Sequence, residues 1–351
     1  IGAALALQLA EKGCHLALAD VNGAGLAEVA AKAHAYGVKV STLVLDMGQA
    51  ESAQVLLDHV RAHHGRATVL INNAGVALGG QFEQVSEEDF DWLMSINFGA
   101  VVRLTRVFLP LLQQSQAAQI VNMSSIFGII APPGQTAYSA AKFAVRGFSE
   151  ALRHELEAGN SSVRMTLLHP GGVRTGIATS ARLPASVTAQ EIKLHQKNWQ
   201  KALRLSPEAA VRRILRGIER REPRVLVGDD AVAASWIQRL LPVTYWQWVA
   251  LAIALPLLIL VFLLFSGYTP LFSGMVALAL LGWRSGLAFA VPLMLLGIGH
   301  GLLIPPTLAT TVGLLPALAL LLWRRRPGDG AVPPGVIDAR LLPHLLVRGG
   351  P

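Results

Sequence analysis

The sequence predicts an α/β fold with a doubly wound parallel sheet, followed by an α-helical region of different character. Short apolar runs of strand length alternate with longer segments of helical periodicity up to about residue 230, which is typical of a parallel sheet covered by helices. Several runs end in polar or glycine residues, at the edge where parallel sheets bind ligands. After Trp248 the chain becomes strongly apolar, and this predicts the second region.

Local signals define the elements in chain order. The first expected strand ends at Asp20, and the turn residues Asn22 and Gly23 follow it. Ser86 precedes three acidic residues and caps a long helix, and Pro207 lies near the first turn of a later one. Helices are expected at 1–10, 24–36, 49–64, 86–112, 136–157 and 207–219, and strands at 15–19, 38–45, 68–71, 119–123, 163–168 and 224–227.

The apolar region is expected to cross a membrane. Of the whole chain 52% is hydrophobic and 15% is charged, whereas about 25% charged residues is usual for a soluble domain. Four apolar runs favour four crossings, which place Arg284 and the run 324–326 on the cytoplasmic side. The runs are 249–265, 271–283, 286–304 and 308–323, so we expect transmembrane helices over 249–323 and a disordered tail over 324–351.

The net charge of +8 does not indicate nucleic-acid binding. Lys and Arg are scattered without a basic stripe or a known nucleic-acid motif, and their clusters flank the apolar region. Cys14 is the only cysteine, which excludes an intrachain disulfide and favours a reducing compartment. His59 and His63 are four residues apart but lack a metal motif, so no metal site is expected. We therefore expect a cytoplasmic domain attached to a membrane.

The centre of the expected chemistry is the pair Tyr138 and Lys142. Their spacing of four residues in helix-forming sequence places both side chains on one helix face. A free phenol has a pKa near ~10, and a cation held beside it lowers that pKa. Tyr138 would then serve as a general acid and base at neutral pH.

An ordered set of polar residues accompanies this pair. Asn73 to Gly75 follow one apolar run, Ser124 and Ser125 follow another, and 170–175 follow a third, with Asn97 between the first two. In this order they resemble the short-chain dehydrogenase/reductase family, over about residues 1–230. The resemblance implies a Rossmann-like fold and NAD(P)-dependent interconversion of a small-molecule alcohol and a ketone or aldehyde by hydride transfer.

The resemblance also implies roles for four catalytic residues. Ser125, thirteen positions before Tyr138, would hydrogen-bond the substrate oxygen, and the neighbouring Ser124 would not. Tyr138 would transfer the proton, while Lys142 would lower its pKa and hold the nicotinamide ribose. Asn97 would hold the water that links Lys142 to solvent.

Other residues match cofactor-binding positions of that family. Asp20 would accept hydrogen bonds from the adenosine ribose and repel a 2′-phosphate, which favours NAD over NADP. Alternatively, Asp20 only caps the turn that follows it. The remaining candidates are Gly2, Asp46, Asn73, Ala74, Gly75, Pro170, Gly171, Val173 and Thr175, together with Tyr138 and Lys142.

The chain begins inside an expected helix. In the family, a strand and a glycine-rich turn precede the position that Gly2 matches. We therefore expect the sheet to lack its first, central strand and the chain as written to bind NAD poorly.

The expected organisation is an enzyme domain at 1–235, with a substrate lid at 176–206, followed by an amphipathic connector at 236–248 and the apolar region. Family resemblance implies a homodimer through the helices that contain Asn97 and Tyr138. The stretch 297–306 resembles a late helix of major facilitator transporters. The rival interpretation is thus a membrane protein or transporter remnant with a non-catalytic Rossmann appendage, produced by fusion or misassembly. The intact catalytic set favours the enzyme.

Overall fold

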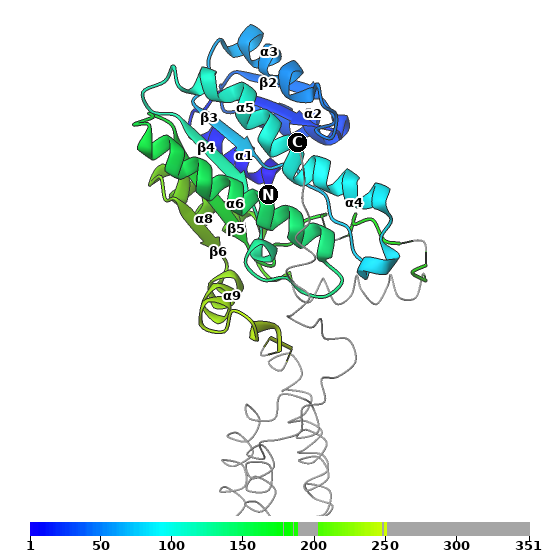
Figure 1. Ribbon diagram of the computed structural model, residues 1–351. Coiled ribbons are helices and arrows are strands. Elements are labelled where there is room, and N and C mark those ends of the chain that lie inside the picture. The colour runs from blue at the N-terminus through cyan, green and yellow to red at the C-terminus, as the bar shows by residue number, and fades with distance from the viewer. Residues whose placement is uncertain (178, 185, 189–202, 248, 251–351) are drawn as a thin grey trace, which may run out of the picture. The chain divides into compact units, whose positions relative to one another are not determined.

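The computed structural model describes residues 1–177, 179–184, 186–188, 203–247 and 249–250. They belong to one compact unit, Ile1–Leu251 (Figure 1). The expected transmembrane helices from residue 251 onward, the expected tail and the middle of the expected lid lie outside the described residues.

The strands are all parallel, as predicted, but they form two sheets. β1 (Leu16–Asp20) pairs with β2 (Val40–Val44). The second sheet has the order β3-β4-β5-β6. Its strands are Val69–Asn72, Gln119–Met123, Arg164–Pro170 and Arg224–Val227. A cavity of about 1020 Å³ lies between the two sheets, lined by residues of both β1 and β3.

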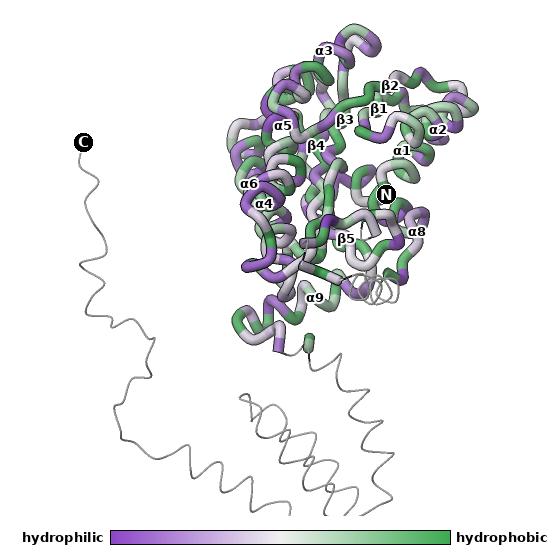
Figure 2. Tube along the Cα trace, turned by 90° about the vertical axis from the view of Figure 1, so that its right-hand side faces the viewer, coloured by the Kyte–Doolittle hydropathy of each residue, from purple (hydrophilic) through white to green (hydrophobic). Residues whose placement is uncertain are grey.

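Helices cover both faces of the four-stranded sheet (Figure 1). Ile120 of β4 faces a core shared with α3 (Ser52–His64) and α5 (Ala100–Leu112), whereas its neighbour Val121 faces α8 (Pro207–Glu219). This alternation is the side-chain period of a strand buried on both faces. In Figure 2 the strand β3 is coloured as hydrophobic, while α4 (Glu87–Met94) and α6 (Thr136–Ala158) carry mixed colours. The remaining helices are α1 (Gly2–Glu11), α2 (Gly23–His34) and α9 (Asp229–Leu240), with short turns η1 (Phe82–Gln84) and η3 (Ile126–Gly128).

One long helix path runs from α4 to α5 through the π-helical segment η2 (Ser95–Gly99). Such π-helical insertions often occur at functional sites. Among the described residues, this path, Glu87–Leu112, is the one helix long and apolar enough to cross a membrane, and half of its apolar window is buried. The core helix of a soluble protein can have the same length and composition, so this helix does not by itself indicate a membrane crossing.

Two elements differ from the sequence prediction. β5 extends to Pro170 instead of ending at Leu168, because His169 is fully buried and continues the ladder to β6. α9 was not predicted as a helix, and it reaches into the range expected as the connector. Its start has ordinary helix signals, namely Gly228 with a φ of 99° and the acidic residues Asp229 and Asp230 in the first turn.

Candidate active site

The two serines after β4 point in different directions. Ser124 is buried, and its hydroxyl donates to the carbonyl oxygen of Lys142 at 2.9 Å. Ser125 is half-buried and begins η3, where its hydroxyl accepts a hydrogen bond from the Phe127 N–H at 3.2 Å. Its side chain also hydrogen-bonds Tyr138. Ser124 therefore ties β4 to α6, and Ser125 contacts the phenol.

Tyr138 lies in the first turn of α6, where Phe127 packs edge-on against its ring with 6.0 Å between centroids. Removal of water by the surrounding protein raises the pKa of Tyr138 to about 12, and the hydrogen bond with Ser125 acts in the opposite direction. The spacing of Tyr138 and Lys142 predicts a lowered pKa for the phenol. The structure gives the opposite direction because burial dominates.

Lys142 is 2% exposed, and its ammonium donates to the carbonyl oxygen of Met123 at 3.0 Å. The same ammonium lies 5.6 Å from the centroid of the Tyr138 ring. Burial lowers the pKa of Lys142 to about 8, because a charged amine is costly away from water. Tyr138 and Lys142 therefore share one face of α6, as expected, and the Lys142 ammonium points at the end of β4.

Asn97 lies in η2, is fully buried, and clamps one backbone position of the loop after β3. Its amide accepts a hydrogen bond from the Val76 N–H at 2.8 Å and donates to the Val76 carbonyl at 2.9 Å. A Cβ atom added at Gly75 would lie 3.2 Å from Asn97 Oδ1 and 3.5 Å from Lys142 Nζ. The predicted residues Gly75, Asn97 and Lys142 therefore meet at one point, and glycine suits that close approach.

Four of the cofactor candidates line the cavity between the two sheets. Gly2 begins α1 there, and a Cβ atom added to it would lie 2.5 Å from the side chain of Asn73. Asp20 is exposed at the end of β1, and its carboxylate accepts the Asn22 N–H at 2.9 Å. The turn-capping role of Asp20 is thus present in the structure. The four lining residues are Gly2, Asp20, Asn73 and Ala74.

Asp46 follows β2 as predicted, but it does not line this cavity. Its carboxylate accepts hydrogen bonds from the Gly48 N–H at 2.8 Å and from the Gln49 side chain at 3.3 Å. The side chain is exposed, so it remains accessible beyond these turn contacts.

The turn after β5 is held by a residue that the sequence argument missed. The N–H of Gly172 donates to Asp230 Oδ2 at 2.6 Å, and a Cβ atom added at Gly171 would overlap the same carboxylate. Pro170 ends β5, and Val173 is buried beside Leu205. Thr175 is half-buried two residues further on. The pair of aspartates directly after the last strand was the signal for Asp230.

His169 and Val76 were also missed. His169 was assigned no role, although its place beside Pro170 puts it at the carboxyl end of β5, and Val76 acts through its backbone alone. The described part of the expected lid packs on α4, since Arg182 forms an ion pair with Asp89 at 2.9 Å and lies 3.5 Å over the Trp92 ring. Within the described ranges no three metal-ligating side chains gather.

Comparison with known proteins gives concordant matches. The family model described as short chain dehydrogenase matches residues 1–185. The protein SadH of Mycobacterium tuberculosis (strain CDC 1551 / Oshkosh), which carries the name of an oxidoreductase, is 39% identical over 255 residues, covering 72% of this chain and 91% of SadH. A 3-ketodihydrosphingosine reductase of Bacteroides thetaiotaomicron is 38% identical over 152 residues, covering 43% of this chain and 55% of that protein.

Solved structures agree with this result. A short-chain dehydrogenase/reductase from Burkholderia phymatum in complex with NAD has a TM-score of 0.63 at 30% identity, covering 68% of this chain and 88% of that one. A short-chain dehydrogenase from Sphingobium yanoikuyae in complex with NADPH has a TM-score of 0.54 at 27% identity, covering 64% and 82%. The matched sequence, the shared fold and the assembled Ser125, Tyr138 and Lys142 lead to one conclusion: the chain belongs to the short-chain dehydrogenase/reductase family.

Proposed function

We propose that this protein is an NAD(P)-dependent oxidoreductase that interconverts an alcohol and a ketone or aldehyde. The observation that carries the proposal is the contact of the Ser125 hydroxyl with Tyr138 at the carboxyl end of β4, with Lys142 buried beside the ring. A phenol, a hydroxyl and a cation at one point suit proton transfer to a substrate oxygen. This assembled set favours the enzyme over a membrane protein with a non-catalytic appendage.

The residues present fit a nicotinamide cofactor. Gly2, Asp20, Asn73 and Ala74 border one cavity. Gly75 follows in the same loop, where the lack of a side chain lets the backbone lie close to Asn97 and Lys142. The similar solved structures, one in complex with NAD and one in complex with NADPH, also support this cofactor class. When bound, the nicotinamide would supply or accept the hydride.

The chain's own residues would orient the substrate and move one proton. In the oxidative direction Tyr138, as the phenolate, would accept the hydroxyl proton of the substrate, while the substrate C–H bond gives up a hydride and its C–O bond becomes double. Ser125 would hold the substrate oxygen beside that phenol. Lys142 would favour the phenolate through its charge, and Asn97 would keep the loop at Val76 and Gly75 in place.

The deciding experiment is a spectroscopic assay of the full chain with a panel of alcohols, ketones and aldehydes. NAD or NADH is supplied at concentrations high enough to offset the weak cofactor binding expected of this chain. We expect a substrate-dependent change in the absorbance of the reduced nicotinamide in the wild type and its loss in a variant with Tyr138 replaced by Phe. Absence of turnover across the panel with both NADH and NADPH would contradict the proposal.

We further propose NAD as the preferred cofactor, through Asp20. The Asp20→Asn variant keeps an oxygen that can accept the Asn22 N–H, but it removes the charge that repels a 2′-phosphate. We expect the ratio of kcat/KM with NADP to that with NAD to rise by roughly 10-fold or more, since each ~1.4 kcal/mol of lost repulsion is a factor of ten. Asp58→Asn is the matched control, because Asp58 is a 60% exposed aspartate on the surface of α3. An unchanged ratio in Asp20→Asn would contradict the assignment.

Membrane attachment through the apolar region 249–323 remains our proposal, with the catalytic domain on the cytoplasmic side. Support comes from exposed apolar side chains that precede this region in the sequence. Trp236 and Leu240 of α9 and Val243 after it are 57%, 71% and 89% exposed. We expect the full chain to float with phospholipid vesicles in a density gradient. Recovery of folded protein in the lipid-free fractions would contradict attachment. The family resemblance further leads us to propose a homodimer.

A further inference from the structure

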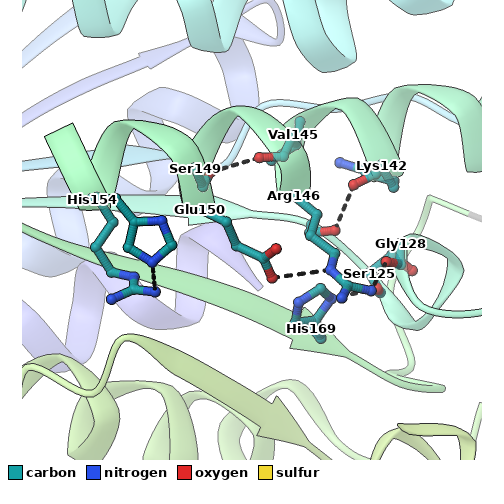
Figure 3. Close-up of polar contacts among 11 residues, drawn as sticks. Ser125, Gly128, Lys142, Val145, Arg146, Ser149, Glu150, His154 and His169 are labelled. Atoms are coloured by element: carbon teal, nitrogen blue, oxygen red, sulfur yellow. Dashed lines mark hydrogen bonds and ion pairs between the residues drawn. The ribbon is translucent and has the colours of Figure 1, made fainter. Parts of the chain in front are cut away.

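The carbonyl oxygen of Ser125 receives two hydrogen bonds. The N–H of Gly128 donates to it at 2.9 Å, within η3. The ring nitrogen Nδ1 of His169 lies at 2.9 Å from the same oxygen, from the neighbouring strand β5 (Figure 3). Both acceptor positions of this carbonyl are therefore filled, and one of them is filled by a side chain 44 residues away.

The protonation of His169 follows from its surroundings. The side chain is 0% exposed, and burial lowers the pKa of His169 to about 4. The hydrogen bond to the Ser125 carbonyl acts in the opposite direction, whereas Arg224 of β6 and Arg146 of α6 lower the pKa further. The ring is therefore neutral near pH 7 and carries one N–H. Because a carbonyl oxygen only accepts, that hydrogen lies on Nδ1 and points at Ser125.

The other ring nitrogen makes no compensating contact. Nε2 of His169 is buried and has no hydrogen-bond partner among the described residues. An unpaired buried acceptor carries a desolvation cost that an apolar side chain of similar size would avoid. The favourable polar contact of this imidazole is thus the bond to Ser125.

The opposite side of the same segment is held by Lys142. Its ammonium donates to Met123 O, and its carbonyl accepts the Ser124 hydroxyl. The Met123 carbonyl and the Ser124 side chain are thereby bonded to α6, while the Ser125 carbonyl is bonded to His169 of β5. A Cβ atom added at Gly128 would overlap Ser124 Oγ, so η3 sits tightly against this junction.

We propose that His169 is a positioning residue: its Nδ1–H fixes the Ser125 peptide group and thereby aims the Ser125 hydroxyl at Tyr138. The proposal rests on the proposed function, because Ser125 and Tyr138 are its substrate-contacting residues. His169 is fully buried, so we expect it to touch neither substrate nor cofactor. Its effect reaches the reaction through the orientation of one hydroxyl.

Two substitutions separate the hydrogen bond from the packing. His169→Leu fills a similar volume without a donor, whereas the side-chain amide of His169→Asn can place an N–H where Nδ1 now lies. Thr166→Val is the matched control, because Thr166 is equally buried on the same strand but bonds Gln119 and Glu222, away from Ser125. Each variant is measured as the full chain.

In the turnover assay we expect His169→Leu to lower kcat/KM by about 10-fold to 100-fold, the scale of a small misplacement at a reacting centre. The affinity for NADH should stay within about twofold of the wild-type value. The hydrogen bond between His169 and Ser125 orients a substrate-contacting residue and is not expected to contribute to cofactor binding. The pKa that governs the pH profile should move upward, because a weaker Ser125 contact lowers the Tyr138 pKa less. His169→Asn should restore most of kcat/KM and return the pKa of the pH profile towards the wild-type value. Thr166→Val should change neither kcat/KM nor that pKa by a similar amount.

A second measurement does not depend on turnover. Hydrogen exchange at the Gly128 N–H, which shares the Ser125 carbonyl, should be faster in His169→Leu than in the wild type or in His169→Asn. An equal exchange rate in all three, an unshifted pH profile in His169→Leu, or the same shift in Thr166→Val would overturn the proposal. The two proposals can fail independently. If the wild type showed no turnover, the proposed function would be wrong, but Gly128 exchange could still be faster in His169→Leu than in the wild type and His169→Asn.

Discussion

Replacement of Tyr138 by Phe is expected to lower kcat by about 10²-fold to 10⁴-fold, the usual contribution of a positioned acid or base. The substitution removes one oxygen atom and keeps the ring that packs edge-on against Phe127. The fold should therefore persist, and affinity for NADH measured by calorimetric titration should change little. A loss in kcat without a loss in cofactor binding assigns the phenol to proton transfer.

Tyr36→Phe is the control for this experiment, because Tyr36 is 50% exposed and lies at the end of α2. It should retain wild-type turnover. Survival of turnover in Tyr138→Phe would remove Tyr138 from the mechanism. Equal losses in both variants would point to a general effect of removing a hydroxyl.

Replacement of Lys142 by Met is expected to abolish turnover and at the same time to stabilise the fold at neutral pH. Burial lowers the pKa of Lys142 from 10.5 to about 8, and a shift of about 2.5 units corresponds to roughly 3 kcal/mol at ~1.4 kcal/mol per unit. Loss of the hydrogen bond to Met123 O offsets about 1 kcal/mol of this gain. A net gain of about 2 kcal/mol would raise the melting temperature by roughly 4–8 °C for a domain of this size.

The stability gained by Lys142→Met should depend on pH. Below pH 8 the lysine is charged in both the folded and the unfolded chain, so the folded protein carries the full cost of burying the charge. The cost declines as the pH rises from 8 to 10.5 and is absent above it, where the amine is neutral in both states. Thermal unfolding of Lys142→Met and wild type at pH 7 and near pH 11 should therefore show a gain that disappears at the higher pH.

Lys32→Met is the control, because Lys32 is 59% exposed and forms an ion pair with Glu28 on the helix surface. Its removal should change stability by less than about 1 kcal/mol and in the unfavourable direction. A Lys142→Met variant that is less stable than the wild type at pH 7 would contradict the cost of the buried charge.

Local sequence was sufficient for most elements and for the catalytic set. Tyr138 and Lys142 share a helix, so their relation follows from spacing alone, and Ser125 follows a strand whose apolar run is unmistakable. The helix at 86–112 was predicted as one element, but its π-helical segment at Asn97 was not, because hydrophobic periodicity does not distinguish one π-helical turn from the surrounding α-helix.

Tertiary contacts explain what the sequence did not reveal. A polar histidine marked the expected end of β5, although neighbouring elements bury His169 completely. The direction of the Tyr138 pKa was wrong for the same reason, since a pairwise spacing argument contains no information on how much water the fold removes.

The tie between Gly172 and Asp230 has a consequence for the order of synthesis. The two residues are 58 positions apart, and the acceptor lies in the first turn of α9. As the chain leaves the ribosome from its N-terminus, Ser125, Tyr138 and the glycine turn all emerge before their carboxylate partner. The turn can therefore take its final form only after the strand β6 and the start of α9 have been synthesised. This site is thus completed late in the translation of the domain.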